Sequence, residues 1–89
     1  MLELRPNCEC CNVDLAADSR DAMICSYECT FCAPCANVIL NRICPNCGGE
    51  LVRRPIRPAS HLARNPASTV RVVRQNPCEP INAGANDSR

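Results

Sequence analysis

The residues in this sequence best suited to chemistry are its 10 cysteines, an unusually large number for a chain of 89 residues. Eight of them form four pairs whose members are separated by two or three residues. The pairs are Cys8 and Cys11, Cys25 and Cys29, Cys32 and Cys35, and Cys44 and Cys47. Two sulfurs so close in sequence can point at one centre, and zinc prefers four thiolates in a tetrahedron with bonds of about 2.3 Å. Four pairs therefore predict two zinc ions (Zn²⁺) per chain, each held by four cysteines.

A disulfide framework is the competing interpretation of so many cysteines in a short chain. The segment Met1–Pro6 has no basic region followed by an apolar one, so nothing predicts export into an oxidising compartment. Disulfide frameworks also generally link distant segments, whereas these cysteines are closely paired. We therefore expect reduced thiols that bind metal, in a cytoplasmic protein.

The spacing alone leaves open which pairs share an ion. If neighbouring pairs combine, the first four paired cysteines hold one ion and the last four hold the other. If alternate pairs combine, the chain crosses between the two sites and both ions brace one unit. The first zinc then has the ligands Cys8, Cys11, Cys32 and Cys35, and the second has Cys25, Cys29, Cys44 and Cys47.

The eight-ligand pattern resembles that of the RING finger family from Cys8 to Cys47, with Cys29 where the family usually has His. The segment Phe31–Cys35 leading into a helix, and Pro45 within the last pair, are further matches. The resemblance implies a RING-like cross-brace, a treble-clef-like finger in which alternate pairs combine.

RING fingers that act as ubiquitin ligases dock a conjugating enzyme in a shallow groove, and this sequence departs from their pattern beside the ligands. Cys10 stands where an apolar residue is usual, Gly48 stands where a basic residue often follows the last ligand, and the chain has no Trp. We therefore expect no recruitment of a conjugating enzyme. A ligase-like RING module remains the alternative function.

A closer resemblance extends over the whole chain, to a family of small bacterial cysteine-rich proteins known only as a domain of unknown function. The segments that carry this resemblance are Met1–Cys11, Ile24–Ser26, Glu28–Cys32 and Cys44–Val52. It implies no activity.

Short elements must position the cysteines, because the chain has only two aromatic residues and too few large apolar side chains for a substantial core. Met23–Ile24 predicts a strand that enters Cys25, and Thr30–Phe31 predicts a strand returning antiparallel to it. Glu50–Arg53 predicts a closing strand. The expected fold class is a small zinc-stabilised α+β finger with a short β-hairpin and one short helix.

The helix is expected to begin at Pro34, a residue favoured at the first helical position. After it, Cys35, Val38, Ile39 and Ile43 recur at helical spacing. Gly48 and Gly49 follow the last pair, where glycines allow backbone N–H groups to turn toward the sulfurs. This predicts a zinc knuckle.

The composition changes after Val52 to Arg, Pro, Ala, Ser and Asn. It predicts a RING-like double zinc finger at residues 1–53 and an Arg/Pro-rich flexible tail at residues 54–89, most of it disordered. Thr69–Arg74 is expected to be an exposed flexible segment, although its strand composition leaves open that it joins a sheet edge or stays extended. Residues 1–47 carry three Arg against six acidic residues, whereas residues 48–89 carry seven Arg against three.

Two cysteines remain after the eight ligands are assigned. Cys10 is expected to be a partly buried thiol packing beside the site, with exchange for Cys8 as a ligand the alternative. Cys78 is expected to be a free thiol in the tail, with a redox or intermolecular disulfide the alternative. His61, the single histidine, is expected to be solvated.

Parts of the sequence also suggest two other binding chemistries. The arginines of the tail are expected to form a solvated linker, and nucleic-acid binding through them is the alternative, although no aromatics lie among them to stack bases. They are Arg53, Arg54, Arg57, Arg64, Arg71 and Arg74. The run Cys29-x2-Cys32-x2-Cys35 followed by Cys44-Pro45 resembles the iron–sulfur ligand run of a bacterial ferredoxin, but it would leave the other paired cysteines unused.

The sequence offers no catalytic set around its one histidine, and tetrathiolate zinc sites have no open position for a substrate. We therefore expect a protein that is not an enzyme, namely a zinc-binding structural and interaction module. Its expected role is a protein–protein adaptor with an unknown protein partner, present as a monomer or weak homodimer. No run of residues is long and apolar enough for a membrane span.

Overall fold

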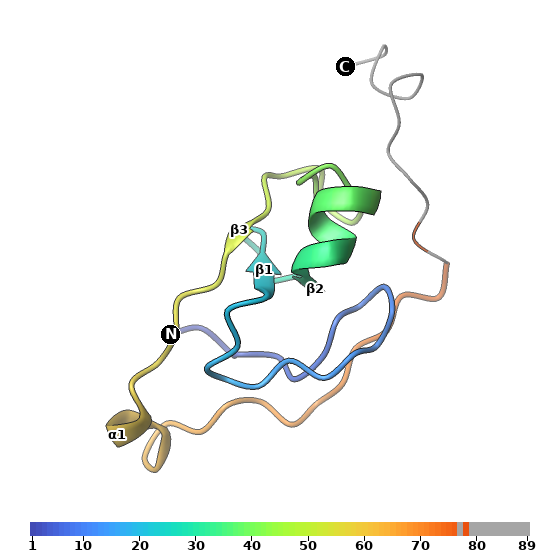
Figure 1. The fold of residues 1–89 in the computed structure, drawn as a ribbon. Coiled ribbons are helices and arrows are strands. Elements are labelled where there is room, and N and C mark those ends of the chain that lie inside the picture. The colour runs from blue at the N-terminus through green and yellow to red at the C-terminus, as the bar shows by residue number, and fades with distance from the viewer. Residues whose placement is uncertain (77, 79–89) are drawn as a thin grey trace.

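The computed structural model describes residues 1–76 and residue 78. In chain order the elements are strands β1 (Ala22–Ile24) and β2 (Thr30–Cys32), the π-helical turn η1 (Cys35–Ile39), strand β3 (Val52–Arg53) and helix α1 (Ala59–Leu62). These elements are all short, so loops make up most of the described chain (Figure 1).

The three strands form one antiparallel sheet in the order β2-β1-β3. Met23 in β1 pairs with Phe31 on one side and with Arg53 on the other. The predicted hairpin and the predicted closing strand are therefore confirmed. The hairpin turn is closed by a hydrogen bond from the Glu28 N–H to the Cys25 carbonyl (2.9 Å).

The predicted helix is confirmed in its position, but it is shorter than its apolar spacing suggests. It starts after Pro34, and the Leu40 N–H donates to the Cys35 carbonyl (2.9 Å), five residues back. Asn41 and Arg42 then have φ of +52° and +60°. This left-handed conformation ends the helix before Ile43, which instead pairs with Glu50 beside the sheet.

The core is thin and lies between the sheet, η1 and the N-terminal loop. Its large side chains include Leu15, Phe31, Leu40 and Leu51, all at most 5% exposed. The remaining places in this cluster are filled largely by cysteines, which are Cys8, Cys25, Cys32, Cys35 and Cys44. Packing of this size stabilises a fold weakly by itself.

Residues 68–76, here called the C-terminal strap, run alongside the N-terminal segment in the same direction (Figure 1). Hydrogen bonds join them at a constant offset of 65 residues, in the pairs Glu3–Ser68, Asn7–Val72 and Glu9–Arg74. The Asn7 side chain makes two of these bonds, since its amide donates to the Val72 carbonyl (2.9 Å) and accepts from the Val72 N–H (3.3 Å). The strap forms no strand, and of the arrangements considered for Thr69–Arg74 it has the extended one.

The interpretation of the tail arginines as a solvated linker is wrong for Arg54, which is only 2% exposed. Its guanidinium donates to the carbonyls of Arg5 (2.8 Å) and Ala16 (2.9 Å), so it fastens the end of β3 to the N-terminal loop. The predicted division of the chain at residue 53 stays a prediction. The predicted disorder of residues 77 and 79–89 concerns residues outside those described.

Within the described part of the chain, neither helix is long and apolar enough to cross a membrane.

Candidate metal centres

Four cysteine sulfurs meet in a first cluster, and every pair of them lies within 4.8 Å. They belong to Cys8, Cys11, Cys32 and Cys35. The sulfurs of Cys11 and Cys32 are 3.7 Å apart. A tetrahedron with metal–sulfur bonds of 2.3 Å has edges of about 3.8 Å, so this spacing suits one shared metal ion.

The first cluster joins the N-terminal loop to the end of the sheet and the start of η1. The loop turns back on itself because the Asn12 N–H donates to the Cys8 carbonyl (2.9 Å), with Asn12 at a φ of +63°. Cys32 is the last residue of β2, and Cys35 is the first of η1. Pro34 between them fixes the chain direction at the helix start.

A second cluster lies at the hairpin turn and the knuckle. The sulfurs of Cys25, Cys44 and Cys47 are all within 4.8 Å of one another. Cys29 is not among these three. Burial is the main cause of the raised pKa of the Cys29 thiol, and the side chains of Cys25 and Cys44 also interact with it. The Cys25 N–H donates to the Cys29 carbonyl (3.3 Å), so Cys29 lies at the same hairpin turn, and its role as the fourth ligand stays a prediction.

Backbone N–H groups point at four of these sulfurs, each from two residues further along the chain. The donor–acceptor pairs are Cys10 to Cys8 (3.3 Å), Tyr27 to Cys25 (3.3 Å), Asn46 to Cys44 (3.4 Å) and Gly49 to Cys47 (3.4 Å). Such donors stabilise negative charge on sulfur, as in a metal-bound thiolate. At Gly49 an added Cβ would lie 3.3 Å from the Cys47 sulfur, and Gly48 has a φ of +79°. Both glycines therefore fit the predicted knuckle.

The electrostatics of each cluster also favour a bound cation. Burial acts to raise the pKa of Cys8, but hydrogen bonds from backbone N–H groups outweigh it and lower this pKa. In the same cluster burial and the neighbouring sulfurs raise the pKa of Cys35, and in the second cluster burial is the main cause that raises the pKa of Cys44 to about 12. Several thiolates cannot share such a small space unless a positive ion offsets their repulsion.

The sulfurs of the first cluster come from alternate pairs, and three of the four sulfurs expected in the second cluster lie together. Cys8 and Cys25 fall in different clusters, whereas the neighbouring-pair arrangement would place them in one. The ferredoxin-like run is also divided, because Cys32 belongs to the first cluster and Cys44 to the second. The two clusters form a candidate metal-binding module, and the assignment of each cysteine as a ligand remains a prediction.

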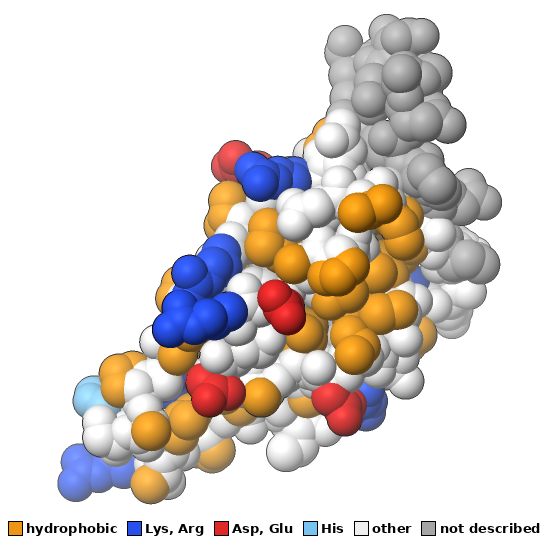
Figure 2. All heavy atoms as spheres, in the orientation of Figure 1, with side chains coloured by type: hydrophobic (Ala, Val, Ile, Leu, Met, Phe, Trp, Pro, Cys, Tyr) orange, Lys and Arg blue, Asp and Glu red, His pale blue; other side chains and the backbone are white. Residues whose placement is uncertain are grey.

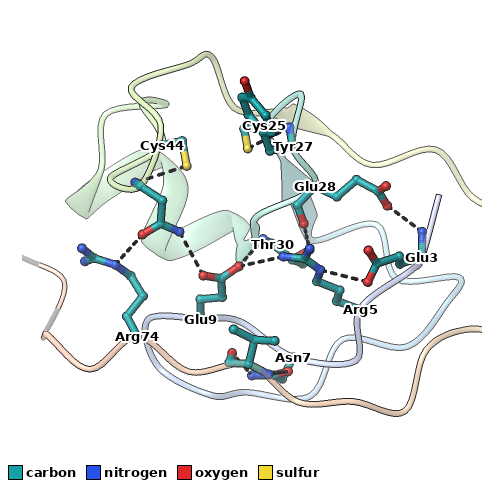
Figure 3. Close-up of polar contacts among 12 residues, drawn as sticks. Glu3, Arg5, Asn7, Glu9, Cys25, Tyr27, Glu28, Thr30, Cys44 and Arg74 are labelled. Atoms are coloured by element: carbon teal, nitrogen blue, oxygen red, sulfur yellow. Dashed lines mark hydrogen bonds and ion pairs between the residues drawn. The ribbon is translucent and has the colours of Figure 1, made fainter.

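The buried carboxylate of Glu9, only 4% exposed, connects the surroundings of the two clusters (Figure 3). One oxygen accepts from the Thr30 N–H (3.1 Å) and from the Arg5 guanidinium (3.4 Å). The other accepts from the Asn46 side-chain amide (3.0 Å), and the backbone N–H of Asn46 points at the Cys44 sulfur (3.4 Å). Glu9 thus holds the first cysteine loop, the start of β2 and the knuckle together.

We expect Glu9→Gln to lower the free energy of unfolding by about 1–3 kcal/mol, because the amide turns one buried acceptor into a donor and removes the charge that faces Arg5. The matched control is Glu3→Gln. Its carboxylate also pairs with Arg5 but is 54% exposed, so we expect a loss below about 0.5 kcal/mol. Urea unfolding of the metal-loaded chains measures both, and equal losses would contradict this role for Glu9.

The two remaining cysteines form a disulfide, Cys10–Cys78, with their Cα atoms 5.4 Å apart. The predictions of a free Cys78 thiol and of an unpaired Cys10 are therefore wrong. The alternative considered for Cys78, a disulfide, is the one that the structure shows, although within the chain. Once eight cysteines are assigned to pairs, the two left over are the signal that could have identified this bond. His61 is exposed, as expected.

Three residues around the clusters were missed by the sequence reasoning, namely Glu9, Asn46 and Arg54. Glu9 and Asn46 lie between cysteines, where a polar residue is normally interpreted as part of a solvated loop. Arg54 follows another arginine, Arg53, which is exposed. No local sequence pattern distinguishes the buried Arg54 from the exposed Arg53.

Comparison with known proteins gives two matches. The family described as "Protein of unknown function (DUF1272)" matches residues 1–57, a region that contains all eight paired cysteines. An uncharacterized protein from Rhizobium meliloti (strain 1021) is 65% identical over 83 residues, which cover 93% of this chain and 99% of that protein. No solved structure matches the chain significantly. The predicted resemblance to a bacterial cysteine-rich family of unknown function is confirmed.

Proposed function

This chain belongs to the DUF1272 family, and we propose that it is a two-zinc interaction module that presents a rigid surface to a protein partner. One observation carries the proposal. Thiols of four separate segments gather into two clusters at distances suited to metal coordination, and backbone N–H groups point at their sulfurs.

Zinc is the metal that this donor set favours. Closed sets of cysteine thiolates bind zinc tetrahedrally, and the first cluster contains no carboxylate or imidazole. In the proposed loaded form the first ion is held by Cys8, Cys11, Cys32 and Cys35, and the second by Cys25, Cys29, Cys44 and Cys47. This is a RING-like cross-brace.

Such sites stabilise structure and do not catalyse, because four protein ligands leave no position for water or substrate. The proposed module is therefore not an enzyme, and its work is done by its surface. A cytoplasmic location is part of the proposal, since reduced thiols are needed for zinc binding.

The surface over η1 is the proposed contact for a partner. Val38 on this helix is 80% exposed, and Figure 2 shows hydrophobic side chains gathered over η1. Tyr27, next to the second cluster, is 73% exposed. Exposed apolar and aromatic side chains on a rigid base are typical of protein–protein contacts.

Nucleic-acid binding finds less support. Four of the tail guanidinium groups already donate to acceptors within the chain, namely those of Arg54, Arg57, Arg71 and Arg74. A phosphate would have to compete with these acceptors.

The adaptor role is tested by capturing partners on the zinc-loaded chain and on two variants. We expect Val38→Asp to keep two zinc ions by native mass spectrometry but to lose at least about 90% of a specifically retained protein, because a charge in an apolar contact costs a few kcal/mol. Val70→Asp is the control, since Val70 is 68% exposed and lies on the strap. Retention of no protein, or equal retention by Val38→Asp, would refute the adaptor role.

A further inference from the structure

Cys10 and Cys78 stand apart from the other eight cysteines. They belong to neither sulfur cluster, they are separated by 68 residues, and they are bonded to each other. Cys78 also lies beyond residues 1–57, where the family match ends. The bond ties the chain just after the C-terminal strap to the loop that carries the first cysteine pair.

We propose that Cys10 and Cys78 form a reversible thiol–disulfide site that reacts with a small-molecule disulfide such as oxidised glutathione, and that its state decides how firmly the C-terminal strap is held on the finger. This inference concerns two residues that the proposed metal sites do not use.

The hydrogen bonds of the C-terminal strap bring its end close to Cys10, where the disulfide forms. Its hydrogen bonds with Glu3, Asn7 and Glu9 keep a constant offset, so the two segments run side by side toward Cys10 and Cys78. Among the described residues, these hydrogen bonds and those of Arg71 and Arg74 to the finger also hold the strap. A covalent link at the end of the run removes the fraying to which a chain terminus is otherwise prone.

The surroundings of the bond allow exchange. Both cysteines are partly exposed, so a small thiol or disulfide can approach them. The Arg74 guanidinium lies 3.7 Å from the Cys78 sulfur. A cation in this place stabilises the negative charge on sulfur when the bond is broken.

The reaction balances with glutathione alone. The Cys78 thiolate attacks the glutathione disulfide, forming a mixed disulfide and releasing one glutathione thiolate. The Cys10 thiolate then attacks the Cys78 sulfur and releases the second. One S–S bond is broken and one is formed, the two cysteines are oxidised, and their protons end on the two glutathione thiols.

The Cys10–Cys78 site lies beside groups that contact both sulfur clusters. The Cys10 N–H donates to the sulfur of Cys8 in the first cluster. Arg74 donates to the Asn46 side chain (2.9 Å), and the Asn46 N–H points at Cys44 in the second cluster (Figure 3). Closing the bond therefore orders groups beside both clusters without using a ligand of either.

The test uses the zinc-loaded full chain equilibrated in glutathione buffers of increasing oxidised fraction, followed by alkylation and peptide mapping. We expect a single Cys10–Cys78 linkage that forms and disappears reversibly. In the oxidised chain, tryptic cleavage after Arg71 and Arg74 should be slower by about tenfold or more, because cleavage tracks local opening. Cleavage after Arg20, in an exposed position of the N-terminal loop, is the internal reference and should not change.

Cys78→Ser and Cys10→Ser should each show the fast cleavage in every buffer. Linkage of Cys78 to a cysteine of the clusters, absence of any linkage in the most oxidising buffer, or a bond that the most reducing buffer leaves intact would each overturn the proposal. So would a redox-dependent cleavage rate that persists in Cys78→Ser. Peptide mapping identifies the bond directly, whatever metal the clusters bind.

Discussion

Removing the metal with a strong chelator under reducing conditions is expected to abolish the cooperative unfolding transition of this chain. Structural zinc sites contribute on the order of 10 kcal/mol each to folding, whereas the core here rests on few large side chains and on the cysteines themselves. The loss should be followed by circular dichroism and denaturant titration. Adding zinc back should restore the transition.

The same experiment on Cys78→Ser provides the control for the disulfide. This variant keeps all eight proposed ligands, so it should bind two zinc ions and lose its transition on chelation in the same way. A metal-free reduced chain that still unfolds cooperatively would show that this fold does not depend on bound metal.

The second large effect is expected for Arg54→Met, with a loss of about 2–4 kcal/mol in the free energy of unfolding of the zinc-loaded chain. Arg54 is buried, and burial lowers the pKa of its guanidinium. Its donors go to the carbonyls of Arg5 and Ala16, which would be left without them in the variant. Methionine keeps much of the volume and replaces none of the hydrogen bonds.

The neighbouring residue offers a matched control. Arg53 is exposed and lies in β3, so Arg53→Met should change stability by less than about 0.5 kcal/mol. Arg54→Lys should fall between the two, because lysine keeps the charge but not the planar fork that reaches two carbonyls. Equal effects at residues 53 and 54 in urea unfolding would contradict the bracing role of Arg54.

The parts of the fold that the sequence predicted correctly are those with local signals. The strands around Met23 and Phe31 have apolar residues between turn residues, and Pro34 marks the start of the helix. Pair spacing indicates a ligand pair but not its partner pair, so the sequence left two groupings open. The structure gathers the sulfurs of Cys8 and Cys11 with those of Cys32 and Cys35, and the complete cross-brace stays a prediction.

The contacts that the sequence did not predict join residues far apart in the chain. The strap pairs with the N-terminal segment through backbone groups and one asparagine side chain, Asn7, which leave no composition signal. Cys78 pairs with a residue 68 positions away, so its partner could not be read from spacing. The helix ended early because Asn41 and Arg42 adopt left-handed conformations that apolar periodicity does not report.

The buried polar groups could not be predicted from the sequence for a related reason. Glu9 and Arg54 belong to residue types that usually lie on the surface, and they are buried here because partners from several segments satisfy them. Such partners become visible only when the fold brings these segments together. A short chain with few large apolar side chains uses polar contacts of this kind to position its cysteine loops.

The central claim, that alternate cysteine pairs bind two metal ions, is tested most directly by proton–cadmium correlation NMR of the chain loaded with ¹¹³Cd. Two cadmium signals are expected. One should correlate with the β-protons of Cys8, Cys11, Cys32 and Cys35, and the other with those of Cys25, Cys29, Cys44 and Cys47. A single cadmium signal, or one signal that correlates with both Cys8 and Cys25, would contradict it.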